Sequence, residues 1–282
     1  MFKIYDLNFK EVPLPLDQLG YGIKGLDINI GPIQHENVYT STSNTDQLHK
    51  VVAKDREVSI NILATSKDTE DWRLKRDVVY KFFRRLGAFY IAEEYQPHKL
   101  LKVIVDGNYN VDRPITRWGL SEIPLKVLDT PFKRSLYTSL TLNNEGNKFN
   151  DKWSAGMGIL TDSSTWKYRF VNEQPRFLNI GDTSIKLIKE KESYIELRIN
   201  EDANFIEIND GKNTFRYNKP VKSGDVLLIK GSDITLNGKN VLGDTNFTFL
   251  EVSESWNSWE VRILHLGLVL KTVGVYWQCY GC

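Results

Sequence analysis

Apolar and polar residues alternate along much of the chain with the two-residue period of a half-buried β-strand. Between residues 56 and 64, Val58, Ile60 and Ile62 alternate with polar neighbours. This pattern places the apolar side chains on one face of the predicted strand and the polar ones on the other. Similar alternation, or short apolar runs, predicts strands at residues 2–7, 21–30, 89–92, 100–105 and 120–128. We therefore expect the first half of the chain to form a β-sheet with a buried face.

One segment of this half has the period of an α-helix instead. Residues 69–86 have acidic residues in the first turn and basic residues in the last, which suits the helix dipole. Asp68 or Thr69 can cap the free amides at the start, and Gly87 can end the helix. The apolar side chains on one face are Trp72, Val79, Phe82, Phe83 and Leu86. We expect this face to pack on the sheet.

A polar stretch between about residues 31 and 54 interrupts the sheet pattern. It has no strong period, but β-forming residues lie on both sides of Ser41–Asp46, and it is too long for an ordinary hairpin loop. We interpret it as a projecting hairpin, or arm, that contacts a neighbouring subunit. The candidate contact residues are Asn37, Val38, Tyr39, Leu48 and His49.

The second half of the chain has the pattern of a β-sandwich. A polar break at residues 143–148, NNEGNK, suits a domain boundary, so we expect domains at 1–142 and 143–282. Turn signals then recur about every dozen residues, at 209–211, 223–225 and 237–238. The segments 194–199, 226–229 and 247–252 around them alternate as short strands do.

The composition narrows the range of partners and compartments. Lys and Arg number 37 against 36 for Asp and Glu, so the protein has almost no net charge to attract a nucleic acid. The first residues, MFKIYDLNFKEVPLP, lack the apolar core of a signal peptide, and we expect synthesis in a reducing cytoplasm. The apolar residues 261–280 are interrupted by polar ones and predict buried strands rather than a membrane span.

No segment has the residues of a catalytic, metal or cofactor site in a suitable context. Gly20, Gly22 and Gly25 match the GxGxxG spacing, but a strand rather than a helix is predicted after them, so we expect turn glycines. The four histidines stand far apart, and Cys279 and Cys282 form only half of a four-ligand zinc site. The acidic doublets Glu93–Glu94 and Glu70–Asp71 are better explained as solvated strand charges and as helix N-terminal charges. We expect no enzyme activity.

Two tryptophans leave one alternative open. Trp256 and Trp259 could stack on sugar rings from the surface of a β-sandwich, although tryptophans in final strands are more often part of the core. The alternative function is therefore a carbohydrate-binding adhesion module that recognises host cell-wall glycans.

Several segments, taken in order, resemble the distal tail proteins of siphophages, particularly those of Gram-positive hosts. In the first half these are LDINI (26–30), REVSINILA (56–64), the helix DWRLKRDVVYKFFRRL (71–86) and IPLKVLDTPF (123–132). In the second half they are IEINDGKNTF (206–215), SGDVLLIKG (223–231), ITLNGKNV (234–241) and NFTFLEVSESWNSWEV (246–261). The chain departs from the usual pattern after Trp259, where the last residues are more continuously apolar.

The resemblance implies a mainly β protein with two domains. The first would be a tail-tube-like belt domain, a β-sandwich with one packed helix, and the second a galectin-like β-sandwich. Members of this family form a hexameric ring at the tip of a long non-contractile tail. They join the tail tube protein to the tail-associated hub protein, and often carry the receptor-binding protein. The resemblance thus implies a structural protein of the virion, with no cofactor, nucleic-acid specificity or membrane insertion.

Overall fold

A computed structural model describes the chain except for residues 43–44, 149–151, 154–156, 190–192, 263–265 and 272–282. The chain divides into two compact units, Met1–Lys133 and a second that begins at Arg134. The mainly β fold class is confirmed. The first unit ends at Lys133 and not at residue 142, nine residues before the boundary that the polar break at 143–148 predicts, because the segment before the break belongs by its contacts to the second unit.

The first unit is built on one antiparallel sheet. Its main path runs in the order β1-β6-β7-β9-β5-β2, with β8 beside β9. The bounds are β1 Phe2–Tyr5, β2 Ile23–Ile30, β5 Val58–Thr65, β6 Ala88–Glu93, β7 Lys99–Val105, β8 Asp112–Ile115 and β9 Trp118–Val127. The alternation predicted for β5 is confirmed, since Val58, Ile60 and Ile62 are buried.

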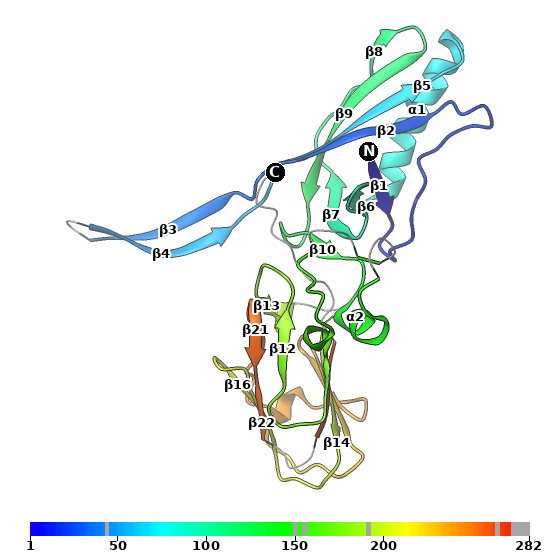
Figure 1. Ribbon diagram of the computed structural model, residues 1–282. Coiled ribbons are helices and arrows are strands. Elements are labelled where there is room, and N and C mark those ends of the chain that lie inside the picture. Colours follow the sequence, from blue (N-terminus) through cyan, green and yellow to red (C-terminus); the bar gives the residue numbers. More distant parts are fainter. Residues whose placement is uncertain (43–44, 149–151, 154–156, 190–192, 263–265, 272–282) are drawn as a thin grey trace. The chain divides into compact units, whose positions relative to one another are not determined.

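Helix α1 (Thr69–Leu86) packs on this sheet, as Figure 1 shows. Asp68 is its N-cap and accepts from the amides of Glu70 and Asp71 at 3.0 and 2.9 Å, so the capping prediction is confirmed. Trp72, Val79 and Phe83 are buried in the core beneath it, and Phe82 and Leu86 are partly buried. Gly119 of β9 lies under the Trp72 ring, where a Cβ atom would come within 1.8 Å of the ring.

The predicted hairpin is present in the first unit as a separate two-stranded sheet, β3 (His35–Thr42) with β4 (Thr45–Ala53). It extends away from the curled sheet of its own unit (Figure 1). We call these two strands the arm. Its register is regular except between Val38 and Tyr39, where β4 contains one extra residue, His49.

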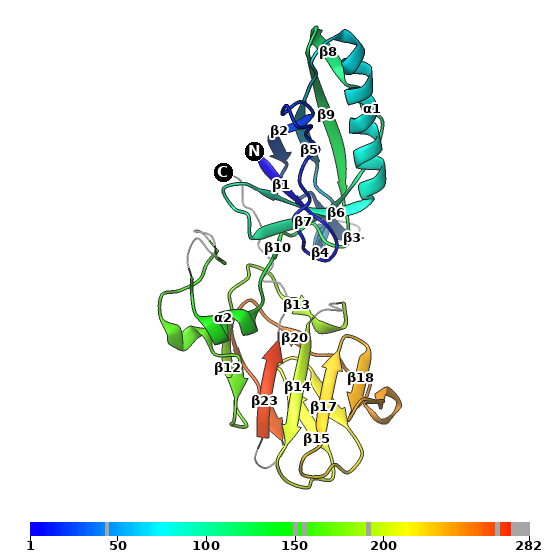
Figure 2. The same cartoon turned by 90° about the vertical axis from the view of Figure 1, so that its right-hand side faces the viewer.

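The second unit consists of short antiparallel strands with one short helix, α2 (Ser139–Glu145), which the sequence pattern did not predict. Its longest sheet has the order β11-β23-β14-β17-β18-β19, and Figure 2 shows β23, β14 and β17 side by side. These strands are β11 Arg169–Phe170, β14 Tyr194–Ile199, β17 Val226–Lys230, β18 Asp233–Leu236, β19 Lys239–Asn240 and β23 Leu266–Lys271.

The other strands of the second unit form shorter pairings. They are β12 Arg176–Asn179, β13 Ile185–Lys186, β15 Ile206–Asn209, β16 Thr214–Tyr217, β20 Glu251–Val252, β21 Ser255–Ser258 and β22 Glu260–Arg262. The two-residue strand β10 (Arg134–Ser135), where this unit begins, takes no part in them. The segment predicted as a strand at 247–252 is a strand only at β20, because the chain before it follows the short 3₁₀ turn Leu242–Asp244 and has a positive φ of 54° at Phe247. Strands are present at β22 and β23 within the apolar segment, and residues 272–282 lie outside the described part.

Candidate functional site

One face of the arm carries three apolar side chains in neighbouring positions. Tyr39 pairs with Leu48, and Val51 pairs with Asn37, two positions before Tyr39 on β3. Residues directly opposite one another, and residues two apart on a strand, share a face. Tyr39, Leu48 and Val51 therefore form a stripe, which we call the apolar stripe.

All three side chains of the apolar stripe are open to solvent. Their exposed fractions are 54%, 54% and 51%, in the order Tyr39, Leu48, Val51. Apolar groups clustered on an exposed sheet face are typical of a contact surface. Val51 was missed by the sequence reasoning, because the face it belongs to depends on the pairing register.

The remaining predicted arm residues are divided between the two faces. Val38 lies on the face opposite to Tyr39, across from Lys50. His49 is the extra residue of the bulge. Asn37 shares the face of the apolar stripe, next to Val51. The structure thus brings together part of the predicted set, and separates Val38 from Tyr39.

The root of the arm is fastened by backbone hydrogen bonds. The Gly31 amide donates to the Glu57 carbonyl at 2.8 Å, and the Gln34 amide donates to the Asp55 carbonyl at 3.0 Å. The Lys54 amide donates in return to the Gln34 carbonyl at 2.7 Å. The two strands of the arm are therefore paired from the point where they leave the sheet.

A second exposed apolar group lies on the outer face of β9. The burial pattern of β9 alternates strictly at its start, and Trp118 and Leu120 fall on the exposed side, with Ile115 of β8 paired to Trp118. A solvent-facing side of a strand normally carries polar residues. The signal in the sequence is that apolar residues occupy both registers of the segment Trp118–Leu125.

The two tryptophans of the glycan alternative differ in environment. Trp259 is only 2% exposed and packs edge-on against Phe177, with 5.1 Å between ring centroids. It cannot stack on a sugar, and this part of the alternative is wrong, because the ring fills the core of the second unit. Trp256 is 44% exposed, and the Arg176 guanidinium lies over its ring at 4.8 Å.

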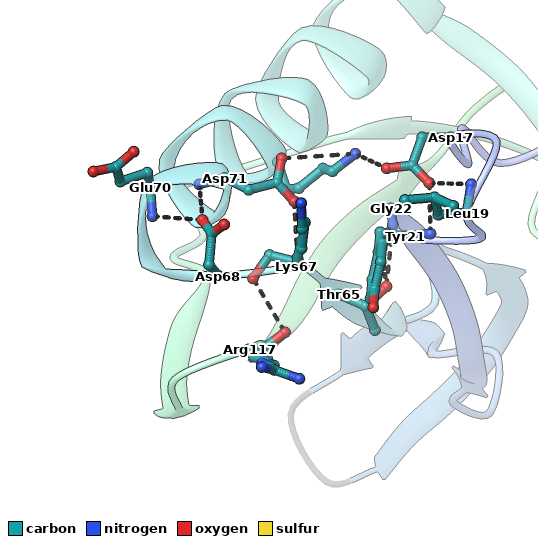
Figure 3. A network of polar contacts seen from close by, with 12 residues as sticks. Asp17, Leu19, Tyr21, Gly22, Thr65, Lys67, Asp68, Glu70, Asp71 and Arg117 are labelled. Carbon is teal, nitrogen blue, oxygen red and sulfur yellow. Dashed lines mark hydrogen bonds and ion pairs between the residues drawn. The ribbon is translucent and has the colours of Figure 1, made fainter.

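The GxGxxG segment has a structural role. The Gly22 amide donates to Thr65 Oγ1 at 3.0 Å, and the Thr65 amide donates to the Gly22 carbonyl at 2.8 Å, so this loop is bonded to the end of β5 (Figure 3). A Cβ at Gly22 would come within 2.2 Å of the Pro15 carbonyl oxygen. Gly25 lies within β2. The prediction of turn glycines therefore holds for the packed loop at Gly22, where close backbone approach requires glycine.

Figure 3 also shows how this loop is joined to α1. Lys75 of the helix donates to Asp17 at 2.6 Å, and its ammonium lies 4.0 Å from Asp71. The Lys75 hydrogen bond lowers the pKa of Asp17, and the hydrogen bond from the Asp71 amide lowers the pKa of Asp68. The charges at the helix start are thus used in capping and in fastening the loop.

The remaining candidate acids and metal ligands are also accounted for. Glu93 accepts from the buried ammonium of Lys133 at 2.5 Å, while Glu94 is exposed. Within the described ranges, no group of three or more His, Cys, Asp or Glu residues is placed to hold a metal ion. Cys279 and Cys282 lie outside those ranges. In the same part of the chain, no helix combines the length and apolar character that crossing a membrane requires.

The architecture defines a class of protein. Residues 23–127, from β2 to the end of β9 with the arm and α1 between them, match the family of phage tail protein RIFT-related domains. Over these residues the first unit is therefore similar to a known phage tail protein domain. A search of curated protein sequences finds no match.

The whole chain also has the fold of a particular tail protein. It superposes on the crystal structure of SPP1 Dit (gp 19.1), described as a paradigm of the hub adsorption apparatus in phages that infect Gram-positive bacteria, with a TM-score of 0.64. The two chains are 10% identical, and the match covers 96% of this chain and 98% of SPP1 Dit. A chain of the activated phage p2 baseplate with Ca matches at a TM-score of 0.41 and 10% identity, over 96% of this chain and 97% of that one. The resemblance to siphophage distal tail proteins that the sequence indicates is confirmed.

Proposed function

We propose that the protein forms a ring at the distal tip of a long non-contractile phage tail, where it joins the tail tube to the tail-associated hub and host-adsorption apparatus. The observation that carries the proposal is a phage tail domain within a chain whose fold matches SPP1 Dit over nearly its full length. It assembles with copies of itself into a ring of six chains, and its other partners are the tail tube protein, the hub protein and a receptor-binding protein. It is made in the bacterial cytoplasm and ends in the virion.

The exposed apolar groups of the first unit suit a head-to-tail ring. A cyclic assembly uses two different, complementary patches on each subunit. The apolar stripe of the arm (Tyr39, Leu48, Val51) is one such patch, and the outer face of β8 and β9 (Ile115, Trp118, Leu120) is another. We assign the arm to contacts with neighbouring subunits, in the same ring or in a stacked one, and the β8–β9 face to contacts within the ring.

Virions are the decisive sample, because a recombinant ring can require its tail partners. Antibodies against the protein should label the tail tip in negative-stain images, and native mass spectrometry of the purified chain should give a closed oligomer. Phage with residues 37–50 replaced by a short Gly-Ser turn should lack normal tails. Normally tailed, infectious particles with the shortened arm would overturn the role of the arm, and absence of the protein from virions would overturn the proposal as a whole.

A second candidate function, glycan binding by the second unit, rests on Trp256 alone. Its half-exposed ring is the kind of platform on which sugars stack. Arg176 already covers part of it, which leaves less of the ring for a ligand. Isothermal titration with host cell-wall glycan would decide: saturable binding that Trp256→Ala removes would favour this candidate, and absence of heat would exclude it.

We also propose that the protein has no hydrolase activity. One member of each acidic doublet has a structural partner, since Glu93 accepts from the Lys133 ammonium and Asp71 accepts from the Lys67 amide. The pure protein should release no product from peptidoglycan or teichoic acid. Sustained turnover, abolished by a single carboxylate substitution, would contradict this.

A further inference from the structure

Arg56 links two segments of the first unit that lie far apart in the sequence. It precedes β5 at the root of the arm, and Arg56 as a whole is only 4% exposed. Its Nε and Nη2 donate to the Gly31 carbonyl at 2.9 and 2.5 Å. Its Nη1 donates to the Pro131 carbonyl at 3.3 Å. One side chain therefore bonds both to the start of the arm root and to the last residues of this unit.

Pro131 belongs to the segment through which the chain leaves the first unit. We call residues 128–133 the exit segment. Its start is bonded to β7, because the Leu128 amide donates to the Lys102 carbonyl at 2.9 Å and the Lys102 ammonium lies 2.7 Å from Asp129. Its end is held by Lys133, whose buried ammonium lies 2.5 Å from Glu93. Arg56 holds the middle.

The bonding pattern requires a guanidinium. Arginine presents its donors in a planar fork that reaches two acceptors in different directions, whereas a lysine ammonium is a single compact donor group. Both acceptors are backbone carbonyls, and hydrogen bonds from a charged donor are stronger than neutral ones, especially where water is excluded. Removing the fork would leave the Gly31 and Pro131 carbonyls without these donors at the same time.

We propose that Arg56 couples the arm to the exit segment, so that a displacement of the arm on docking is transmitted to the chain that leads into the second domain. Thermodynamic coupling is reciprocal, so loosening the exit segment must also loosen the arm root. This inference goes beyond the ring function. It concerns one chain by itself and is tested without assembly.

Hydrogen exchange of the full-length protein tests the coupling. It is measured by mass spectrometry at a dilution at which native mass spectrometry shows only single chains. The reporters at the arm root are the hydrogen-bonded amides of Gly31, Gln34 and Lys54. Pro131→Gly increases the conformational freedom of the backbone whose carbonyl accepts from Arg56. With Arg56 intact, this change should speed exchange at the arm root several-fold.

Two further variants separate coupling from general loosening. Lys102→Met removes the ion pair with Asp129 at the same exit segment and leaves the bonds of Arg56 in place. Amides near Leu128 and Thr130 should therefore exchange faster, while those of the arm root should not. Arg56→Lys should speed exchange about tenfold at both the root and the exit segment. In the Arg56→Lys protein, adding Pro131→Gly should no longer change the exchange rates at the arm root.

The proposal is overturned if Pro131→Gly leaves exchange at the arm root unchanged when Arg56 is present. It is also overturned if Pro131→Gly speeds this exchange equally with Arg56 and with Lys at that position. Should Arg56→Lys open the core strand β5 as well, the comparison of Pro131→Gly with Lys102→Met decides alone. Because rings play no part in these measurements, a failure of the coupling is distinguishable from a failure of the ring function.

Discussion

Two tryptophans close together in the sequence have opposite environments. Trp256 alternates with Asn257 on β21, where Asn257 is buried and Trp256 points outward. Trp259, beyond the end of that strand, turns into the core against Phe177. The residue type alone therefore does not show whether a tryptophan belongs to the core or to the surface, since a large aromatic ring is equally suited to both.

Substituting each tryptophan by alanine should give very different stabilities. Trp259→Ala removes a fully buried ring and should cost about 3–5 kcal/mol of unfolding free energy. Trp256→Ala should cost less than about 1 kcal/mol, mainly through the lost cation–π contact with Arg176. Urea unfolding monitored by circular dichroism measures both. Equal losses would mean that Trp256 is part of the core.

The helix cap predicts a dependence of stability on pH. The pKa of Asp68 is lowered from its ordinary value of 3.8, first by the hydrogen bond from the Asp71 amide, and that of Asp17 is lowered by Lys75. A carboxylate with a lowered folded-state pKa stabilises the protein above its ordinary pKa, and this contribution is lost as the pH falls through the folded-state value. The urea midpoint should therefore fall as the pH drops below about 4.

Asp68→Asn tests the assignment, because asparagine retains a capping oxygen but cannot titrate. The loss of stability at low pH should be shallower in this variant than in the parent. Glu94→Gln, which removes an exposed negative charge from the same unit, serves as the matched control. An identical acid profile for Asp68→Asn and the parent would show that the cap does not contribute.

At the scale of elements, the arm depends on a single extra residue. The bulge at His49 shifts the register between Val38 and Tyr39, and this shift brings Leu48 onto the same face as Tyr39 and Val51. Without it, Leu48 would lie on the opposite face, because a slip of one residue moves every side chain to the other side of the sheet. The bulge thus assembles the apolar stripe.

Replacing the apolar stripe by serines should affect assembly and not folding. Tyr39→Ser, Leu48→Ser and Val51→Ser alter side chains that are half exposed, so each should change stability by less than about 0.5 kcal/mol. The triple variant should remain folded and lose oligomers in native mass spectrometry. The matched control is Val38→Ser with Lys50→Ser on the opposite face, which should assemble. A control that fails as completely as the triple variant would contradict the assignment of one face.

At the scale of the whole molecule, assembly is assigned to the first domain. The apolar stripe and the β8–β9 face both lie within Met1–Lys133. A fragment of residues 1–142 should therefore retain the oligomeric mass class of the full chain, in native mass spectrometry at tens of micromolar. A second fragment that ends at Lys133, where the contacts divide the chain, should behave in the same way. Assembly that requires the second domain would contradict this, and the ring contacts would have to be sought there.

The sequence by itself determined the features that depend on neighbours along the chain. The alternation in β5 predicted its buried face, and the acids, bases and cap of α1 predicted both helix ends, because strand period, capping and dipole effects act within a few residues. The same local signals predicted a hairpin at the arm and a mainly β second half.

Only the tertiary structure decided which of these residues act together. The face of the arm depends on a bulge in the pairing register, and Trp259 is buried because Phe177, far from it in sequence, packs against it. Gly119 is required because the Trp72 ring of α1 covers it, and Arg56 reaches a carbonyl 75 residues further along the chain. Contacts between residues so far apart leave no local period or spacing in the sequence, since they arise only when the sheet, the helix and the exit segment pack together.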